Sequence, residues 1–197
     1  MALVIALASA SNWLARPHIF TFVFLVVWYH LLICYHRLGD RKVLFWMPPV
    51  MLLGVNLHGG FVLGFILLAI YFFGTLGQAC FVSRTENKDW LKKARNLALT
   101  IAACVVVSGL NPYGFHTLIF PFRVVQDQFL MDHISEYLSP NFHSSAVKPF
   151  EFLLLTTLGV FALAQTRLAA IELALVVIFG HMALYSSRHI PLFAIIA

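Results

Sequence analysis

The chain has 197 residues, of which 61% are hydrophobic and only 11% are charged. Soluble domains contain about 45–50% apolar and about 25% charged residues, so this composition excludes a cytosolic enzyme, an intrinsically disordered chain and a nucleic-acid-binding domain. The net charge is +5, but most of the 13 Lys and Arg residues stand in short segments between apolar runs. This distribution is typical of membrane orientation rather than of a surface that binds nucleic acid.

Apolar runs predict an all-α, polytopic integral membrane protein with about five full transmembrane helices and a partial helix at each end. We expect the spans to lie within Ile19–Tyr35, Val43–Val82, Leu97–Leu110, Phe150–Gln165 and Leu168–Tyr185. The second of these runs is long enough for a helical hairpin. Its turn is predicted at Asn56–Gly60, and Pro48 and Pro49 are expected to kink its first arm.

Both ends of the chain are apolar but too short to cross a bilayer. Met1–Ala10 and Ile190–Ala197 each supply only a fraction of the ~20 residues that a span needs. A helix end inside the hydrocarbon must be covered by protein, because no water is present there to satisfy its backbone. We therefore expect residues 1–197 to form a single transmembrane helical domain that is a fragment of a longer protein or has a protein partner.

The positively charged residues predict the orientation of the spans. Nine of them fall on one side when the spans alternate, namely Arg37, Arg41, Lys42, Arg84, Lys88, Lys92, Lys93, Arg95 and Arg167. The other four are Arg16, Arg123, Lys148 and Arg188. Because cytoplasmic segments carry the excess of Lys and Arg, the first group is assigned to the cytoplasm, where its members are expected in basic loops.

The extracytoplasmic side then collects the short polar motifs. These are RPH at 16–18, NLHGG at 56–60, NPYG at 111–114 and SSRH at 186–189. Any binding site is therefore expected on that side. The long segment 111–149 also lies there, and its aromatic residues predict an interfacial or re-entrant segment. Within it, Asp132, His133 and Glu136 favour a solvated amphipathic face over a metal or acid–base site, because no ligand spacing is complete.

Five short motifs occur in order between about Arg16 and Ala197: RPHIFTFVF, VNLHGGFVLG, LNPYG, EYLSPNFH and SSRHIPLFA. Their order and shared extracytoplasmic placement resemble a group of bacterial polytopic proteins akin to the GT-C glycosyltransferase superfamily. The resemblance implies a multi-pass protein of the bacterial inner membrane that uses a polyprenyl-phosphate-linked sugar. GT-C enzymes carry their acidic catalytic residue in the first large outer loop. No segment here matches that loop, so the resemblance assigns no catalytic residue to this chain.

Six polar residues are candidates for binding the phosphate of a lipid carrier: Arg16, His18, Asn56, His58, Arg188 and His189. The two arginines stand where apolar helices meet the outer interface, and a guanidinium binds phosphate through two parallel N–H donors. Snorkelling of the arginines to ordinary headgroups is the alternative. For Asn56 and His58 the alternative is a hairpin turn whose polar groups cap two helices. We expect no metal ion, no cofactor and no nucleic-acid partner under this interpretation.

A second functional interpretation stays open, in which the chain is a non-catalytic transmembrane subunit of a larger membrane complex, next to a pigment or haem. His30 and His181 lie well inside predicted spans, and ionisable residues within a membrane are often functional. Either one could serve as the single ligand of a pigment, whereas a hydrogen bond buried between helices is the alternative for both. A transporter is less favoured, because no inverted repeat is visible.

Overall fold

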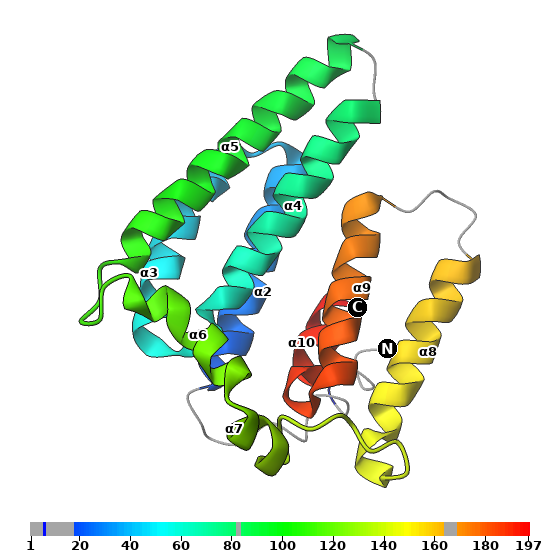
Figure 1. The fold of residues 1–197 in the computed structure, drawn as a ribbon. Helices are drawn as coiled ribbons and strands as arrows, with labels where there is room; N and C mark the ends of the chain where they lie inside the picture. The colour runs from blue at the N-terminus through cyan, green and yellow to red at the C-terminus, as the bar shows by residue number, and fades with distance from the viewer. Residues whose placement is uncertain (1–5, 7–17, 82–83, 164–168) are drawn as a thin grey trace. The chain divides into compact units, whose positions relative to one another are not determined.

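The computed structural model describes Ala6 and residues 18–81, 84–163 and 169–197. Within these residues every regular element is helical (Figure 1), which confirms the predicted all-α class. In chain order the elements are α2 (His18–Leu38), η1 (Arg41–Trp46), α3 (Met47–Leu57), η2 (Gly59–Phe61), α4 (Val62–Phe81), α5 (Arg84–Ser108), α6 (His116–Gln126), α7 (Gln128–His133), η3 (Ser145–Val147), α8 (Lys148–Leu163), α9 (Ala170–Tyr185), η4 (Ser187–His189) and α10 (Ile190–Ile196). The η elements are short 3-10 helices.

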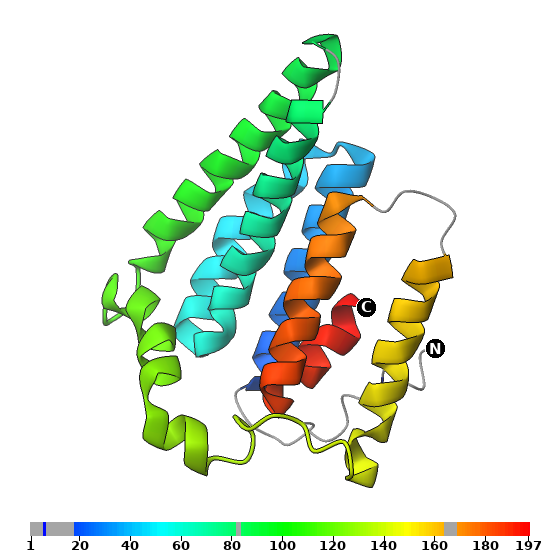
Figure 2. The ribbon, with the colours of Figure 1, turned by 45° about the vertical axis from the view of Figure 1, so that its right-hand side comes forward.

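The chain divides into two compact units, one containing Pro17–Arg123 and the other containing Val124–Ala197. In the first unit, α2 packs against α3 and α4, and α5 packs against the same two helices. In the second unit, α10 packs against α8 and α9 (Figure 2). Helix α6 runs across the boundary between the units. Each unit is therefore described on its own.

Three helical segments among the described residues are long and apolar enough to cross a membrane: His18–Leu38, Gly59–Phe81 and Ser145–Leu163. The length and composition of these segments indicate a membrane protein. Helix α9 is apolar but has only 16 residues. At 1.5 Å per residue it is about 24 Å long, which is less than the ~30 Å thickness of the hydrocarbon core. The predicted count of about five full spans is therefore not confirmed.

The segment 83–96, which was expected to be a basic loop, is the largest departure from the sequence prediction in the first unit. From Arg84 onward it is the first half of α5, and the predicted span at 97–110 continues the same helix to Ser108. The stretch 84–108 contains no Gly or Pro and is rich in Lys, Arg, Leu and Ala, which favour helix. The prediction of a loop was wrong because charged residues indicate only that a segment lies outside the hydrocarbon core. They do not determine whether its backbone is helical.

Pro48 and Pro49 begin a helix rather than kink one. They are the second and third residues of α3, which begins at Met47 directly after η1. A proline is tolerated there because the first backbone N–H groups of a helix have no intrahelical acceptor. The preceding turn is fixed by Asp40, whose side chain accepts a hydrogen bond of 2.9 Å from the Lys42 backbone N–H. The first arm of the predicted hairpin is therefore divided into η1 and α3.

Close approach of helices around Trp28 organises the core of the first unit. The Trp28 side chain on α2 is fully buried. A Cβ at Gly64 would lie 2.9 Å from both the Trp28 ring and the Met51 side chain, and a Cβ at Gly54 would lie 3.3 Å from the same ring. Small residues allow helix backbones to approach in membranes, where association depends on packing. The two glycines therefore let α3 and α4 reach the indole.

The second unit is built around the short C-terminal helix α10. Six of its seven residues are buried, and Phe193 is fully buried. The Phe193 ring contacts Phe150 of α8 edge to face at 5.9 Å, and Phe193 also approaches Gly180 of α9. The apolar run at the C-terminus, predicted as a partial helix, thus packs between two helices of its own unit. The partial helix predicted at Met1–Ala10 lies outside the described residues apart from Ala6.

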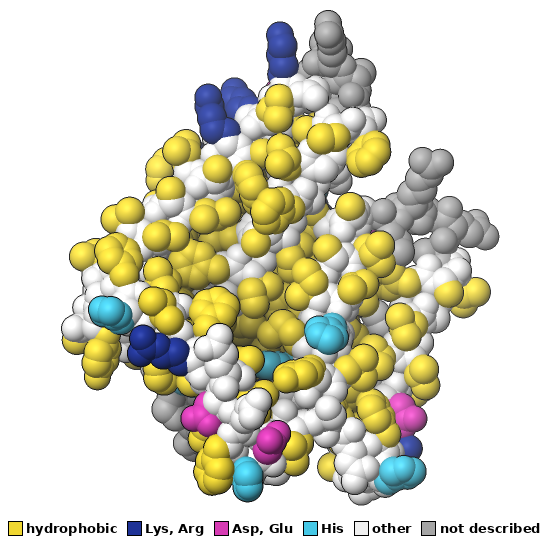
Figure 3. All heavy atoms as spheres, in the orientation of Figure 1, with side chains coloured by type: hydrophobic (Ala, Val, Ile, Leu, Met, Phe, Trp, Pro, Cys, Tyr) yellow, Lys and Arg dark blue, Asp and Glu magenta, His cyan; other side chains and the backbone are white. Residues whose placement is uncertain are grey.

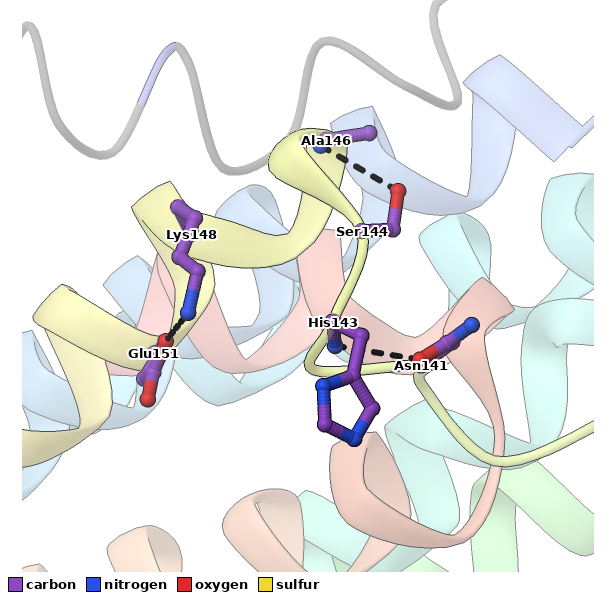
Figure 4. Close-up of polar contacts among 6 residues, drawn as sticks. All are labelled: Asn141, His143, Ser144, Ala146, Lys148 and Glu151. Carbon is purple, nitrogen blue, oxygen red and sulfur yellow. Dashed lines mark hydrogen bonds and ion pairs between the residues drawn. The ribbon is translucent and has the colours of Figure 1, made fainter.

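Side-chain caps fix the start of α8 (Figure 4). The Asn141 side chain accepts a hydrogen bond of 3.0 Å from the His143 backbone N–H, and Ser144 accepts one of 3.4 Å from Ala146 at the start of η3. Within the first turn of α8, Lys148 and Glu151 form an ion pair of 2.8 Å. The second half of the EYLSPNFH motif therefore forms the turn that leads into a candidate span.

Hydrogen bonds mark two distinct ends of the first unit. At one end, the Asn56 side chain donates to the Leu110 carbonyl (3.2 Å), which joins the NLHGG turn to the NPYG turn. At the opposite end, the Tyr35 hydroxyl donates to the Lys93 carbonyl (3.0 Å), which joins the end of α2 to the basic half of α5. The NLHGG and NPYG motifs and the basic half of α5 therefore lie at opposite ends of this unit, as the predicted orientation requires.

These two ends predict opposite accessibility in intact cells. Single cysteines are placed at Lys92 or Tyr113, both exposed, in a chain whose Cys34, Cys80 and Cys104 are replaced by alanine. We expect an impermeant maleimide to label the Tyr113→Cys variant in intact cells and the Lys92→Cys variant only after permeabilisation. Labelling of Lys92→Cys from outside would contradict the assigned orientation.

Candidate functional site

The candidate phosphate-binding residues fall into two groups. His18, Asn56 and His58 belong to the first unit, and Arg188 and His189 belong to the second. Arg16 lies outside the described residues. The two groups differ in their structural surroundings. The residues of the first group stand at the ends of helices, whereas those of the second group stand where two segments of the chain are hydrogen-bonded to each other.

Two of the sequence motifs pair along their backbones in the second unit. The segment 136–139 of EYLSPNFH runs beside the segment 185–188, which contains the first three residues of SSRH. Five hydrogen bonds join them: Ser187 N to Leu138 O (3.0 Å), Arg188 N to Glu136 O (3.0 Å), Ser186 Oγ to Glu136 O (2.9 Å), Ser187 Oγ to Leu138 O (2.9 Å) and Ser139 Oγ to Tyr185 O (3.2 Å). Sequence reasoning placed both motifs on one side of the membrane but did not predict that they contact each other.

This pairing positions the side chain of Arg188. Its guanidinium carbon lies 4.8 Å from the centroid of the Tyr137 ring, which is a cation–π contact. A cation–π contact does not use the N–H groups as hydrogen-bond donors to an oxygen or nitrogen atom, and a guanidinium can form two parallel hydrogen bonds with a phosphate. Arg188 is partly exposed, so an anion can reach it from the surface of this unit.

His189 has a different electrostatic state from its neighbour. Burial lowers the pKa of the His189 imidazole to about 4, and the positive charge of Arg188 acts in the same direction. The imidazole is therefore neutral at pH 7. Its Nδ1 donates to the Met182 carbonyl at 3.2 Å, so in this tautomer Nε2 carries a lone pair and no hydrogen. In this state His189 offers no donor to a phosphate, and Arg188 is the stronger candidate of the pair.

His58 organises the turn between α3 and α4. Its Nδ1 accepts a hydrogen bond from the Gly60 backbone N–H (3.1 Å) and lies 2.7 Å from the Thr21 hydroxyl, which donates to it. Because Nδ1 accepts, the neutral ring carries its hydrogen on Nε2. A Cβ at Gly60 would clash with the Thr21 side chain, so this glycine allows the turn to approach α2.

Asn56 is also committed to backbone groups. Its Nδ2 donates to the Leu52 carbonyl (2.8 Å) and to the Leu110 carbonyl (3.2 Å). Asn111, in the neighbouring NPYG turn, donates to Ser108 and Gly114 and accepts from Tyr113 and Thr117. His18, at the start of α2, contacts the Phe22 ring edge to face at 5.6 Å. These contacts favour the capping interpretation of NLHGG over a phosphate site.

The acidic segment and the membrane histidines complete the survey. His133 stacks on the Phe129 ring at 4.4 Å, and no cluster of three metal-ligating side chains occurs in the part of the chain that the structure describes. His30 and His181 are both exposed on their helices, and His30 Nε2 lies 3.5 Å from Cys34 Sγ. Neither histidine is therefore buried between described helices.

Comparisons with protein-family models, with curated proteins and with solved structures found no match to this chain. The GT-C resemblance thus depends on the order and placement of the motifs themselves.

The contact between Gly60 and Thr21 predicts a position-specific loss of stability. We expect Gly60→Ala to lower the free energy of unfolding by about 1–3 kcal/mol, because overpacking would force the Thr21 side chain away from His58. Gly59→Ala is the matched control, since a Cβ at Gly59 meets nothing within 4 Å. The measurement is thermal unfolding of both purified variants in detergent. Equal midpoints for the two would show that the close approach does not matter.

The lowered pKa of His189 predicts that acid destabilises the second unit. Between pH 6.5 and about 4 the unfolded chain binds a proton that the folded chain excludes, so the free energy of unfolding falls as the pH falls through this range. Above pH 6.5 the residue contributes no pH dependence. His189→Gln keeps a hydrogen-bond donor but does not titrate. We expect the difference in unfolding midpoint between pH 7 and pH 5 to be smaller in this variant, and an unchanged difference would refute the assignment.

Proposed function

We propose that this chain is a membrane-embedded part of a GT-C-like glycosyltransferase of the bacterial inner membrane, in which Arg188 binds the phosphate of a polyprenyl-phosphate-linked sugar. The observation that carries the proposal is the pairing of EYLSPNFH with SSRH, which holds Arg188 over the Tyr137 ring. The order of the motifs along the chain supports the choice of a lipid-linked sugar.

The chemistry of Arg188 suits a phosphate on a lipid. The guanidinium is charged at every physiological pH, and its planar donors match two phosphate oxygens. Buried apolar residues of α10 begin directly after His189, so the cation stands next to an apolar helix. A phosphate attached to a long hydrocarbon chain needs a cation for the phosphate and an apolar surface beside it for the hydrocarbon.

The proposal assigns binding to this chain and no bond-breaking step. Glu136 and Ser186 act through backbone-directed hydrogen bonds, and Tyr137 restrains the guanidinium, so all three are positioning residues. Under this proposal, the acidic residue that such a transferase uses for catalysis belongs to another segment or to a protein partner.

The test compares three substitutions for binding of polyprenyl phosphate to the purified full chain in lipid nanodiscs. We expect Arg188→Ala to weaken binding about ten- to a hundredfold, because a charge-assisted hydrogen bond contributes about 1.5–3 kcal/mol. Arg188→Lys should recover only part of this loss, since an ammonium cannot form the planar pair. Arg123→Ala, which removes an exposed arginine from the same predicted side, is the control.

Two results would contradict the proposal. Equal affinity in the wild type, Arg188→Ala and Arg188→Lys would remove Arg188 from the site. Full replacement by lysine would show simple snorkelling to headgroups instead of bidentate binding.

The alternative of a non-catalytic subunit has one supporting observation. His30 is exposed near the middle of the candidate span α2, and an exposed imidazole inside a bilayer is costly unless a partner covers it. A partner helix or a pigment bound at His30 would provide that cover. Visible absorption by a haem or chlorophyll in the purified full chain would favour this alternative over the transferase.

A further inference from the structure

The first half of α5 carries a basic surface on one face. Lys88, Lys92 and Arg95 are all exposed, and together with Leu91 they line a shallow hollow in the surface. At 100° per residue the three cations fall within an arc of about 60° around the helix. Figure 3 shows the Lys and Arg side chains gathered near this end of α5. We call Lys88, Lys92 and Arg95 the basic face.

Packing of the opposite side of α5 fixes the direction of the basic face. Ala94 and Leu97 are buried against the other helices of the first unit. Lys93, although adjacent in sequence to Lys92, is turned inward, and its Nζ lies 4.5 Å from the centroid of the Trp90 ring. The basic face therefore points away from the core of the unit.

The same outward side of α5 changes from cationic to apolar within about one turn. Leu99 and Val106 continue the line of the basic face, and they are 63% and 65% exposed. The step from Arg95 to Leu99 is about 6 Å along the helix. A surface that changes in this way matches the boundary between lipid headgroups and hydrocarbon, which a single helix crosses when it enters a bilayer.

Aromatic residues mark the same level on three helices. The His36 ring on α2 lies 5.7 Å from the Tyr71 ring on α4 and 5.7 Å from the Trp90 ring on α5. Tyr35 bonds to the Lys93 carbonyl beside them. Tyr35 and His36 stand in the last turn of α2, so the basic half of α5 packs against the end of a candidate span.

We infer that the basic face is a binding site for the phosphates of anionic phospholipid headgroups in the adjacent leaflet. The three cations span about 10 Å along the helix, and their flexible stems reach the headgroup layer. An acidic protein partner would satisfy the charge, but it would not account for the exposed apolar surface that continues directly along the same side of α5. This inference is independent of the proposed transferase function.

The test uses the full chain in nanodiscs that contain a phosphatidylglycerol or a phosphatidylcholine with a photoreactive headgroup. We expect crosslinks at residues 88–95 to form several-fold more with phosphatidylglycerol. Lys92→Gln should lower this preference about fivefold, the factor expected for one cation near an anionic surface. Lys92→Arg should keep it, which shows that the site requires charge. Lys93→Gln is the matched control, because it removes the same charge from the adjacent position on the inward side.

Three outcomes would overturn the inference. The first is equal crosslinking by the two lipids. The second is an equal loss of preference in Lys92→Gln and Lys93→Gln, because it would indicate net charge without a defined face. The third is a preference that persists when all three cations of the basic face are replaced by glutamine, since the anionic lipid would then bind elsewhere.

Discussion

The constraint on which this structure depends is that backbone N–H and C=O groups need partners wherever water is absent. Helices satisfy that need internally, so every regular element among the described residues is helical. The need reappears wherever a helix ends. At the turn between α3 and α4 it is met by His58, which accepts from Gly60, and by Asn56, which donates to two carbonyls. The polar residues of this turn are thus part of the fold before they can be part of any site.

This use of polar side chains separates the candidate residues by physical role. Asn56 and His58 are directed at the backbone or at Thr21 of their own unit. Arg188 is held by its backbone N–H and by a cation–π contact with the Tyr137 ring, and neither contact uses the guanidinium N–H groups as hydrogen-bond donors to an oxygen or nitrogen atom. A residue fixed in this way is preorganised, because its orientation is set without consuming the donors that would recognise a phosphate.

The class of fold could be predicted from the sequence, and several boundaries could not. Apolar length alone predicts α2 and the helix that begins at Lys148, because a span needs about 20 apolar residues whatever surrounds it. The continuous helix α5 escaped prediction, since its basic half looks like a loop when charge is the only signal. Helix propensity over 84–96 contained the missing information. The pairing of Glu136 with Arg188 carried no such signal, because backbone bonds between distant loops depend on tertiary packing.

The two kinds of cationic surface imply two kinds of recognition. On α5, three cations stand on flexible stems along an exposed face, so they respond to the density of negative charge and hardly to its geometry. Arg188 is a single cation whose guanidinium carbon lies 4.8 Å from the centroid of the Tyr137 ring and whose backbone is bonded to a second loop. The free energy with which a guanidinium binds an anion depends on whether two oxygens of that anion lie in the plane of the guanidinium. A membrane surface satisfies the first arrangement. Under the proposed function, the second arrangement binds one phosphate of a lipid-linked substrate in one orientation, and a lysine cannot fully replace the arginine there.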